Sequence, residues 1–348
     1  GGDLTVNKLD LEECFRLFGA VHRIVSSIDI VKRVLQEVID DYISENTIYL
    51  ELRTTPRALA DGTTVNQYIE QVVAAIQAHN INSGHIMTVK LILSIDRGQR
   101  YRDAQRVAEL ASSYFKNPTN SPTDPINPTN SPDTIKTQQN HSANSIKTIV
   151  GLDFSGNPLG GHFDSFRDLF EGARGAGLGI TVHTAELYEL SDSVDPVDGD
   201  ETTSILDFGP DRLGHALHLK QHHLDKRSPT SNQITLSLDS HSDHPHIRNW
   251  RAMGYPVSIN TDDRGVFNTT LSEEIVHVKN VLQLDMSEVV ELIASTISQT
   301  FASAEEKVLL SDRFWREVNK LIESETGGVF TPKKSIKHMH DMSYLITV

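Results

Sequence analysis

An alternation of strand and helix patterns, with polar residues at successive strand ends, predicts an α/β fold of the (β/α)8 (TIM) barrel type. Short apolar runs rich in β-branched residues, such as GITVHT at 179–184, predict buried strands. They alternate with longer segments whose apolar residues recur at helical spacing, which is typical of a parallel sheet. A barrel of this type carries its active site at the carboxyl ends of its strands, where the polar residues of this chain gather.

The predicted elements follow one another in this alternating order along the chain. Helices are expected at 10–25, 29–45, 64–79, 101–115, 162–176 and 201–207. Strands are expected at 48–53, 85–96, 148–158, 179–186, 212–218 and 255–263. Three further patterns, near 272–283, 286–299 and 304–323, predict a helical C-terminal region. A closed barrel needs eight strands, so the sequence predicts an incomplete one.

One segment, 116–147, interrupts the alternation. NPTNSP occurs in it twice, at 117–122 and 127–132, within a run of Pro, Thr, Asn and Ser. Such a composition cannot bury enough apolar surface to fold, which predicts a disordered surface insertion. A linker between two domains has the same composition. Because the alternation resumes afterwards, we favour a single domain over residues 1–348 that carries a long loop.

Composition limits the partners of the chain. The 348 residues carry a net charge of −15, which argues against binding to a phosphate backbone, so we expect no nucleic-acid partner. No apolar run is long enough to cross a bilayer and no signal peptide is evident, so we expect no membrane partner. The single cysteine excludes an internal disulfide and indicates a reducing compartment. We therefore expect a cytoplasmic protein, and a monomer.

Ionisable and polar residues stand at the end of each predicted strand. They are the 53–57 segment RTTPR, Asp96-Arg97, Gly156, His183 with Glu186, His215, and Asp262-Asp263. A neutral imidazole at a strand end can bind a metal, and a nearby Glu can act as an acid or a base. Two adjacent carboxylates repel each other and call for a positive charge, which a zinc ion would supply. The pattern therefore predicts a metal-assisted active site.

Each of these residues also has a structural interpretation. His183 and His215 can be hydrogen-bonded core histidines, and Glu186 can be a solvated surface group. One of the two aspartates can cap the helix that begins near Leu271. Arg57 can form a surface salt bridge. It is the occurrence of all of them at strand ends that favours a site.

Several segments resemble one known family when they are taken together. These are HTAE (183–186), RLGHALH (212–218), PTSN (229–232) and SINTDD (258–263), which resemble the adenosine/AMP deaminase family in order and separation. YLELRTTPR (49–57) and GLDFSGNP (151–158) look like its adenosine deaminase-like branch, the N6-methyl-AMP deaminases. The resemblance extends from about residue 9 to about residue 302, apart from the insertion.

This resemblance implies a metal-dependent hydrolase on a (β/α)8 barrel that deaminates a purine with one Zn²⁺ per subunit. His183 and Asp262 match metal ligands of the family. Glu186 matches the proton donor to the purine ring nitrogen, while His215 and Asp263 match the groups that position and activate the attacking hydroxide. Asp263 is also expected to contact the substrate.

The remaining positions carried over from the family concern the substrate. Gly156 matches a backbone contact to the base, and the residues that hold the nucleotide are His22, Thr54, Thr55, Pro56 and Arg57. Thr hydroxyls and an Arg fork suit a phosphate dianion. The expected reaction is hydrolysis of N6-methyl-AMP to IMP and methylamine. Adenosine or adenine remains an alternative substrate.

Two departures from the family pattern lower the expected activity. No His-x-His strand precedes Leu9, and the polar segment 219–228 contains no strand before PTSN, so barrel strands one and seven are not evident. The loop segment HSDHPH (241–246) does not replace the missing pair. The chain begins with Gly1-Gly2, so we take it as trimmed or as a fragment with an internal deletion, or else as a degenerate family member.

With two protein ligands instead of three or four, zinc would bind poorly. Our hypothesis is that the chain as written is a weak or inactive catalyst. A non-catalytic purine-binding protein is therefore an alternative. Another is a different barrel hydrolase of the same superfamily that acts on another heterocycle, although RTTPR argues mildly against it.

Overall fold

The computed structural model describes most of the chain. The described residues are 11–83, 86–117, 147–186, 200–220, 222–223, 233–237, 247–252 and 254–326. Nearly all of the predicted insertion, residues 118–146, lies outside them, as do PTSN at 229–232 and HSDHPH at 241–246. The expectations for these segments stay predictions.

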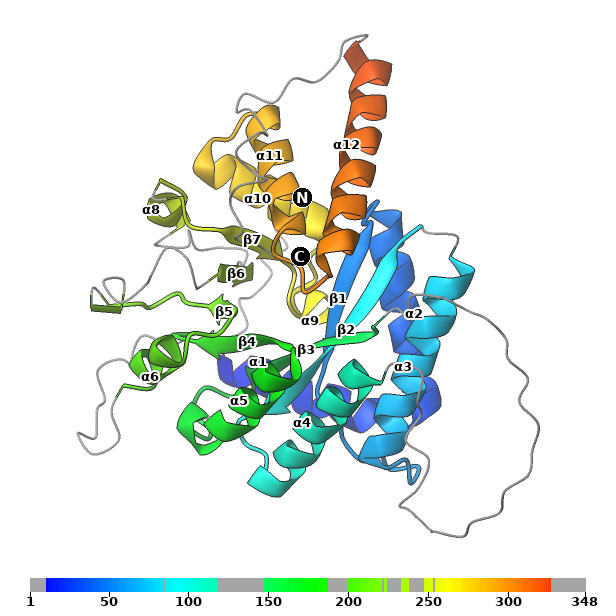
Figure 1. Ribbon diagram of the computed structural model, residues 1–348, viewed down its shortest axis with the longest axis vertical. Helices are drawn as coiled ribbons and strands as arrows, with labels where there is room; N and C mark the ends of the chain where they lie inside the picture. Colours follow the sequence, from blue (N-terminus) through cyan, green and yellow to red (C-terminus); the bar gives the residue numbers. More distant parts are fainter. Residues whose placement is uncertain are drawn as a thin grey trace, which may run out of the picture.

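Seven parallel strands form one curved sheet in the order β1-β2-β3-β4-β5-β6-β7 (Figure 1). Their bounds are β1 Tyr49–Thr54, β2 Thr88–Asp96, β3 Ile149–Ser155, β4 Gly179–Thr184, β5 Arg212–His215, β6 Gln233–Ser237 and β7 Val257–Asn260. Each strand pairs with the next one along the chain, as in a (β/α) barrel. The predicted α/β barrel class is confirmed.

The expectation that the seventh barrel strand is missing is wrong. β6 pairs with β5 on one side, where Leu213 faces Ile234, and with β7 on the other, where Leu236 faces Ile259. The family pattern places this strand before PTSN, within 219–228, whereas β6 follows PTSN in the chain. Its sequence QITLS alternates apolar and polar residues over only five positions, which is a weak signal.

No eighth strand occurs among the described residues. β1 and β7 are the two edges of the sheet there, because β1 pairs with β2 and β7 pairs with β6. Within the described part of the chain, the barrel is therefore open between β1 and β7. The cavity described below lies along this opening.

Contacts between strands that are not neighbours show how strongly the sheet curves. Arg212 at the start of β5 donates to the Glu51 carboxylate of β1, at 2.7 Å, and both side chains are almost fully buried. The Arg212 guanidinium also lies 3.3 Å from the centroid of the Phe301 ring. Since β1 and β5 are four positions apart in the sheet, this ion pair spans the inside of the curve.

Helices cover the outside of the sheet in Figure 1. They are α1 Leu11–Ile24, α2 Ile28–Ser44, α3 Val65–Asn82, α4 Tyr101–Lys116, η1 Phe163–Ser165, α5 Arg167–Ala176, α6 Glu201–Phe208, α8 Ile247–Ala252, α9 Arg264–Phe267, α10 Leu271–Leu282, α11 Met286–Ile297 and α12 Ala304–Thr326. α3 and α4 contact β2, α5 and α6 contact β4, and α10 and α11 contact β7. The three predicted C-terminal helices are confirmed as α10, α11 and α12.

Local sequence signals explain where several helices begin and end. Thr64 and Gln67 form a capping box at the start of α3, and Asp285 and Glu288 form one at the start of α11. α5 ends at Gly177, whose φ of 98° is the left-handed conformation that favours glycine at a helix end. These signals place the helices independently of tertiary packing.

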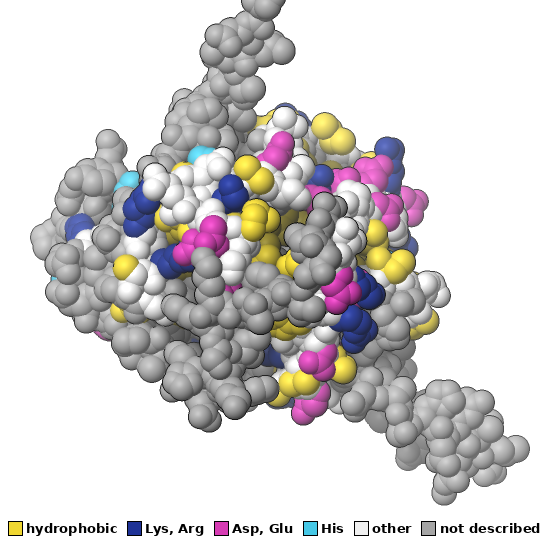
Figure 2. Space-filling model, turned by 90° about the horizontal axis from the view of Figure 1, so that it is seen from above, with side chains coloured by type: hydrophobic (Ala, Val, Ile, Leu, Met, Phe, Trp, Pro, Cys, Tyr) yellow, Lys and Arg dark blue, Asp and Glu magenta, His cyan; other side chains and the backbone are white. Residues whose placement is uncertain are grey.

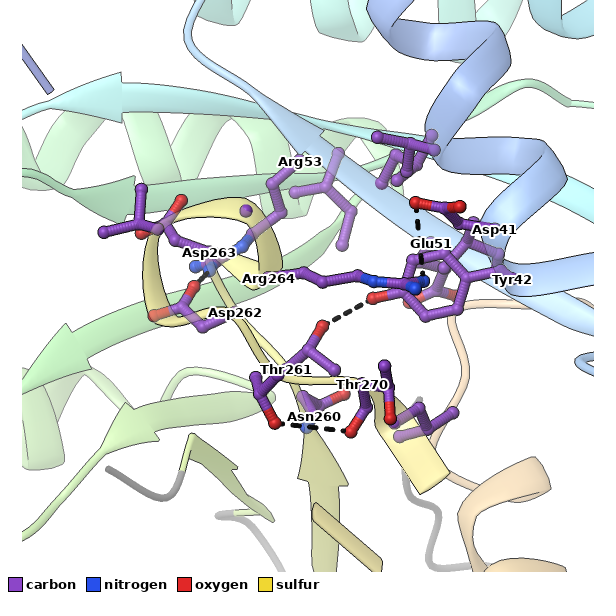
Figure 3. A pocket seen from close by; sticks show the side chains of 18 of the residues that line it. Asp41, Tyr42, Glu51, Arg53, Asn260, Thr261, Asp262, Asp263, Arg264 and Thr270 are labelled. Carbon is purple, nitrogen blue, oxygen red and sulfur yellow. Dashed lines mark hydrogen bonds and ion pairs between the residues drawn. The ribbon is translucent and has the colours of Figure 1, made fainter. Parts of the chain in front are cut away.

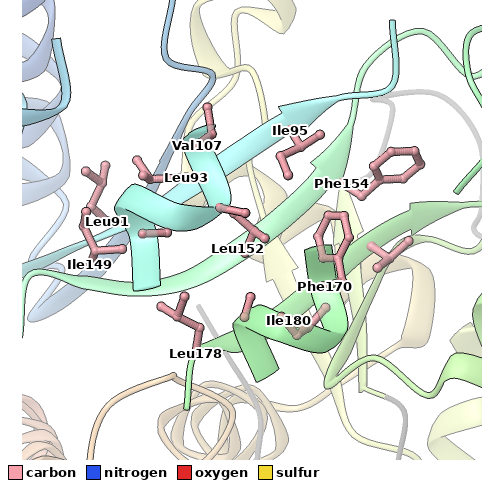
Figure 4. Packing of buried hydrophobic residues seen from close by; sticks show 14 of the residues in the cluster. Leu91, Leu93, Ile95, Val107, Ile149, Leu152, Phe154, Phe170, Leu178 and Ile180 are labelled. Carbon is pink, nitrogen blue, oxygen red and sulfur yellow. The ribbon is translucent and has the colours of Figure 1, made fainter. Parts of the chain in front are cut away.

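The core lies between the sheet and the outer helices. In β2 every residue from Val89 to Ile95 is buried, as expected for a parallel strand covered on both faces. Figure 4 shows Leu91, Leu93 and Ile95 of this strand beside Leu152 and Phe154 of β3. This continuous packing holds the central strands rigid, and their carboxyl ends carry the candidate site.

The described surface is mixed in charge. On the face shown in Figure 2, acidic and basic side chains lie among apolar ones, without a large area of a single sign among the described residues. Within the same residues, no helix combines the length and apolar character that crossing a membrane requires. The excess of negative charge is therefore not gathered on this face.

Candidate active site

A cavity of about 930 Å³ lies between the strand ends and helices α1 and α2. Arg53, His183, His215, Asp262 and Asp263 line one end of it. The apolar side chains of α1 and α2 that line the other end are Leu17, Val21, Val34 and Val38. Five ionisable groups from four strand ends thus share one opening.

His183, the penultimate residue of β4, is held in one ring orientation. Its Nδ1 lies 3.0 Å from the Phe154 carbonyl oxygen and 3.1 Å from Asp153 Oδ1. Gly214 of β5 allows the ring to pack closely, because a Cβ there would lie 3.0 Å from the imidazole carbons. Nδ1–H therefore donates to the carbonyl, and Nε2 faces the cavity with its lone pair.

The guanidinium of Arg53 meets that lone pair. Arg53 Nη1 lies 2.5 Å from His183 Nε2, and Nη2 donates to Asp262 Oδ1. Nη1 also lies 3.5 Å from Asp153 Oδ2. Figure 3 shows the Arg53 and Asp262 side chains meeting at one end of the cavity. A guanidinium has only donors, so its contact with Nε2 requires an imidazole that is unprotonated at Nε2.

Asp153 is a site residue that sequence reasoning missed. It is fully buried in β3 and accepts a hydrogen bond from Ser94 Oγ at 2.6 Å. Burial opposes its ionisation, yet His183 and Arg53 hold the pKa of this carboxyl well below its usual range. A carboxylate in the middle of the apolar run IVGLDF was the available signal, because a buried charge needs a partner.

The same carboxylate affects His183. Burial lowers the pKa of the imidazole, but the Asp153 carboxylate outweighs it and raises the pKa, while the Arg53 guanidinium opposes this rise. The charge of Asp153 thus favours a doubly protonated, cationic imidazole. The contact with Arg53 requires that Nε2 carry no proton, because two donors cannot share one hydrogen-bond position. We therefore interpret His183 as neutral.

His215, Glu186 and Asp262 form a second group on the same side of the cavity. His215 Nε2 lies 3.8 Å from Asp262 Oδ2 and 4.0 Å from Glu186 Oε2. The rings of His183 and His215 are 5.2 Å apart. A substrate atom that reached His215 would thus be near two carboxylates at once, so the structure brings these predicted residues together.

Backbone strain marks the strand ends at this site. His215, Ala216, Ala185 and Asp262 have φ values of 58°, 53°, 53° and 50°. Side chains other than glycine rarely take this left-handed conformation, and such strain is concentrated at functional sites. It turns the chain sharply just where the strands end, which directs His215 and Asp262 toward the cavity.

Asp263 follows Asp262 and lies next to α9. Burial, and then the charge of Asp262, raise the pKa of Asp263 to about 6. The structure records no side-chain hydrogen bond from Asp263 to the start of α9, so it does not cap that helix. A carboxylate with a pKa near neutrality can take up and release a proton at physiological pH.

The residues expected to hold a nucleotide lie beyond the end of β1 and form a separate group. Arg57 Nη2 donates to the carbonyl oxygens of Val25, at 2.7 Å, and of His22, at 3.4 Å. Thr54 Oγ1 shares a hydrogen bond with Tyr68 Oη at 2.7 Å. Thr55 is partly buried beside these residues, and Pro56 is buried. Arg57 thus ties this segment to the end of α1.

Gly156 stands at the end of β3 beside Asp96. Its φ is 102°, and a Cβ there would lie 2.5 Å from Asp96 Oδ2, so only glycine fits. The Asp96 carboxylate also acts on His22, whose pKa is lowered by burial and then by Arg57 while Asp96 opposes the shift. His22, Arg57 and Gly156 are therefore linked through Asp96 and not through the His183 group.

A second cluster with metal-binding side chains lies at the start of α6. Ligand atoms of Asp200, His222 and His223 all lie within 4.8 Å of one another. Asp200 caps α6 through the Thr202 amide, and its Oδ2 accepts from His222 Nε2, at 3.2 Å, and from His223 Nε2. Sequence analysis did not predict this cluster.

The hydrogen bonds of His223 argue against a metal there. The backbone N–H of Lys220 donates to His223 Nδ1 at 3.1 Å, so the ring proton sits on Nε2 and points at Asp200. A ligating imidazole needs a free lone pair on one nitrogen and usually donates through the other. Here one nitrogen is an acceptor for the backbone and the other a donor to Asp200, so we interpret the cluster as structural.

Two residues of the main site, His183 and Asp262, carry groups that can ligate zinc. His183 offers the tautomer that a metal needs, and Asp262 offers a carboxylate beside it. Zinc sites in proteins take three or four protein ligands, however, and Arg53 lies between these two groups. In the described part of the chain these residues, as placed, do not fit a zinc ion.

Most of the chain matches one family model. The model for adenosine deaminase matches residues 3–121 and 131–316. The chain belongs to the adenosine deaminase family. The family consists of metal-dependent hydrolytic deaminases, so the predicted family and enzyme class are confirmed.

Characterised relatives point to one branch of the adenosine deaminase family. An N6-methyl-AMP deaminase of Xenopus laevis is 30% identical over 318 residues, which cover 88% of this chain and 81% of the relative. The human N6-methyl-AMP deaminase is 29% identical over 312 residues, covering 85% and 78%. The predicted branch is the one to which these relatives belong.

Solved structures agree with the sequence relatives. An ADAL–IMP complex superposes with a TM-score of 0.72 at 28% identity and covers 89% of this chain and 84% of that one. The apo N6-methyl-AMP deaminase of Arabidopsis thaliana gives 0.70 at 27% identity, covering 91% and 85%. An adenine deaminase of Arthrobacter aurescens, at 17% identity and a TM-score of 0.67, covers 89% and 85% and shares the fold.

Proposed function

We propose that this chain binds a purine nucleoside monophosphate in the cavity and hydrolyses its 6-amino substituent, with N6-methyl-AMP as the preferred substrate. The observation that carries the proposal is the convergence of Glu186 and Asp262 on His215 at the ends of β4, β7 and β5. The names of the relatives, and the complexes of related proteins with IMP and with GMP, support the substrate class.

The proposed reaction adds water across C6 of the purine. A water oxygen bonds to C6 while Glu186 in its protonated form gives a proton to the adjacent ring nitrogen. The C6–N bond then breaks, the leaving nitrogen takes up a proton, and methylamine and IMP result. Asp263, whose pKa is raised to about 6, and His215 are the groups that would take protons from the water.

Zinc is the ion that we propose for the site, because a histidine nitrogen and a carboxylate oxygen are among its ordinary ligands. His183 and Asp262 are the proposed ligands. We derive no step of the reaction from the ion, since Arg53 occupies the space between these two residues.

Substrate selectivity is proposed to come from the segment after β1. Thr54 and Thr55 precede Arg57 by a few residues there, and the Arg57 guanidinium lies at the His22 carbonyl. Arg57 uses one of its terminal nitrogens for carbonyls of α1, which leaves further N–H groups of its fork for a phosphate. Gly156 is the proposed backbone contact to the base.

The test is a comparison of three substrates on the purified full-length chain. Release of methylamine from N6-methyl-AMP, and of ammonia from AMP and adenosine, is measured with zinc present. We expect N6-methyl-AMP to be turned over fastest, and E186Q to lower kcat about a hundredfold or more. R57M should raise KM for N6-methyl-AMP and leave the turnover of adenosine, which has no phosphate, unaffected.

A non-catalytic purine-binding protein remains the second candidate, because the described residues do not fit a zinc ion. Binding of IMP without any turnover of the three substrates would favour it. If all three substrates are turned over and E186Q does not lower the rates, the proposed role of Glu186 as proton donor is contradicted.

A further inference from the structure

Three groups from three different strand ends contact one guanidinium. Arg53 reaches His183 Nε2, Asp262 Oδ1 and, at 3.5 Å, Asp153 Oδ2. Two of these groups are the proposed metal ligands. The protein therefore already holds a positive charge of its own at the place where the family would hold an ion.

We propose that the Arg53 side chain and a divalent cation are alternative occupants of the space between His183 and Asp262, so that an ion can load only when Arg53 moves away. The inference rests on the proposed function only for the choice of His183 and Asp262 as ligands. It adds a residue of this chain that controls whether those ligands are available.

The hydrogen-bond geometry makes the two occupants exclusive. Nε2 of His183 has a single lone pair, which Arg53 Nη1 meets at 2.5 Å. A zinc ion would lie about 2.0–2.1 Å from the same nitrogen along the same direction. The Asp262 oxygen bound to Arg53 Nη2 is likewise unavailable in this orientation. One guanidinium thus occupies the His183 lone pair and one of the two Asp262 carboxylate oxygens.

Arg53 has room to move. Its side chain is 32% exposed because it borders the cavity, although protein atoms surround the rest of it. Glu37 and Asp41 of α2 line the same cavity. Glu37 pairs with Arg33 and Asp41 lies 3.7 Å from Arg264, but a carboxylate can accept from more than one donor. Figure 3 shows Asp41 across the cavity from Arg53. A displaced Arg53 can therefore keep an ion pair while the ligands turn to an ion.

The charges around this space favour either the Arg53 guanidinium or a divalent ion, and not both at once. Asp153, Asp262 and Asp263 place up to three negative charges around this space. The single charge of the guanidinium compensates only part of them, and a divalent ion would compensate more. Both together would place like charges a few ångströms apart in a poorly solvated space.

The experiment measures zinc affinity directly, without substrate. The full-length chain is freed of metal with a chelator and titrated with zinc in a calorimeter. All variants carry H222A, so that the exposed histidine of the α6 cluster does not contribute. We expect R53M to bind zinc about tenfold more tightly or better than the chain with Arg53.

R264M is the matched control. Arg264 lines the same cavity and lies two positions from Asp262. Its guanidinium pairs with Glu45, at 3.0 Å, and with Asp41, at 3.7 Å, and not with the side chains of His183 or Asp262. Removing its charge changes the field at the site without freeing a ligand. We expect its effect on zinc affinity to stay below about threefold.

Three results would overturn the inference. One is a gain in R53M no larger than that in R264M, and another is equally tight zinc binding with Arg53 in place. The third is a gain in R53M that survives the addition of H183N, because the ion would then lie elsewhere. Should R53M fold poorly in urea unfolding, R53K serves instead, since an amine cannot bridge both ligands and an intermediate gain is expected.

These outcomes are separate from those of the activity test. A gain in R53M together with no turnover of any substrate would support the inference and contradict the proposed function. If N6-methyl-AMP is turned over but all variants bind zinc with equal affinity, the proposed function is supported and the inference about Arg53 is contradicted.

Discussion

Two clusters of imidazole and carboxylate groups in this protein have similar composition but opposite hydrogen bonding. At the main site, His183 donates through Nδ1 to the Phe154 carbonyl and presents Nε2 to a cation, Arg53. At the start of α6, His223 accepts a backbone N–H on Nδ1 and donates through Nε2 to Asp200. Only the first ring directs its lone pair at a cation, because the lone pair of His223 is used by the Lys220 N–H.

Proximity of ligand atoms is by itself a weak criterion for a metal site. The α6 cluster satisfies a distance criterion for three ligands, which the main site does not. An imidazole ligates a metal through one ring nitrogen only when that nitrogen has a free lone pair, and its other ring nitrogen usually donates a hydrogen bond. The hydrogen bonding therefore agrees with the proposed functional role of the His183 group, and we interpret the Asp200 group as structural.

The largest expected difference between the clusters concerns their buried carboxylates. D153N removes a fully buried charge that Arg53 and His183 face, so we expect the free energy of unfolding to fall by about 3 kcal/mol or more. Urea unfolding measures it. D103N, at an exposed pair with Arg100, is the control and should change stability by less than about 0.5 kcal/mol.

D200A should cost less than D153N. Asp200 is 28% exposed and caps α6, so its loss removes a cap and the acceptor of two imidazoles. We expect a loss of about 1–2 kcal/mol in the free energy of unfolding, measured in the same way. A loss as large as that of D153N would show that the two carboxylates are not as different as their burial implies.

The pH dependence of stability should reveal the neutral state of His223. Burial lowers the pKa of this imidazole from 6.5, although Asp200 opposes the shift. Below pH 6.5 the unfolded chain therefore binds a proton that the folded chain refuses, so stability falls as the pH falls. Relative to H223Q, the parent chain should therefore lose stability progressively as the pH falls below 6.5.

Unfolding curves of both proteins at several pH values check this difference. A constant difference between the two proteins over that range would mean that His223 titrates alike in the folded and unfolded states. The assignment of a neutral, structural His223 would then fail.

H222A is expected to have the smallest effect. The His222 side chain is 55% exposed, and its hydrogen bond to Asp200 is shared with that of His223. We expect a change in unfolding free energy below about 0.5 kcal/mol. A fall of more than about 1 kcal/mol would show that His222 belongs to a tighter cluster than its exposure indicates.

Much of the fold could be predicted, because hydrophobic periodicity reports the elements that pack on the sheet. The long helices α2, α4 and α12 and the apolar strand β2 were predicted within a few residues. β6 was missed because five alternating residues between polar segments carry little signal. Sheet pairing revealed it, and pairing is a tertiary property that local patterns do not contain.

The sequence predicted that some residues would lie together at the strand ends, but not the contacts between them. The structure brings His183, His215 and Asp262 together, since parallel strands bring their carboxyl ends to one edge of the sheet. Nothing in the spacing indicated that Arg53, 130 positions before His183, would reach Nε2. Side-chain direction across a curved sheet depends on the closure of the whole fold, so neither Arg53 nor Asp153 could be assigned a role beforehand.

The most direct test of the central comparison is the tautomer of each histidine. Long-range proton–nitrogen NMR spectra of the protein labelled with ¹⁵N-histidine distinguish a ring protonated at Nδ1 from one protonated at Nε2, and H183N and H223Q assign the two signals. We predict a neutral His183 with its proton on Nδ1 and a neutral His223 with its proton on Nε2. A His183 that carries its proton on Nε2 would contradict the account, because that ring could accept neither Arg53 nor a metal ion.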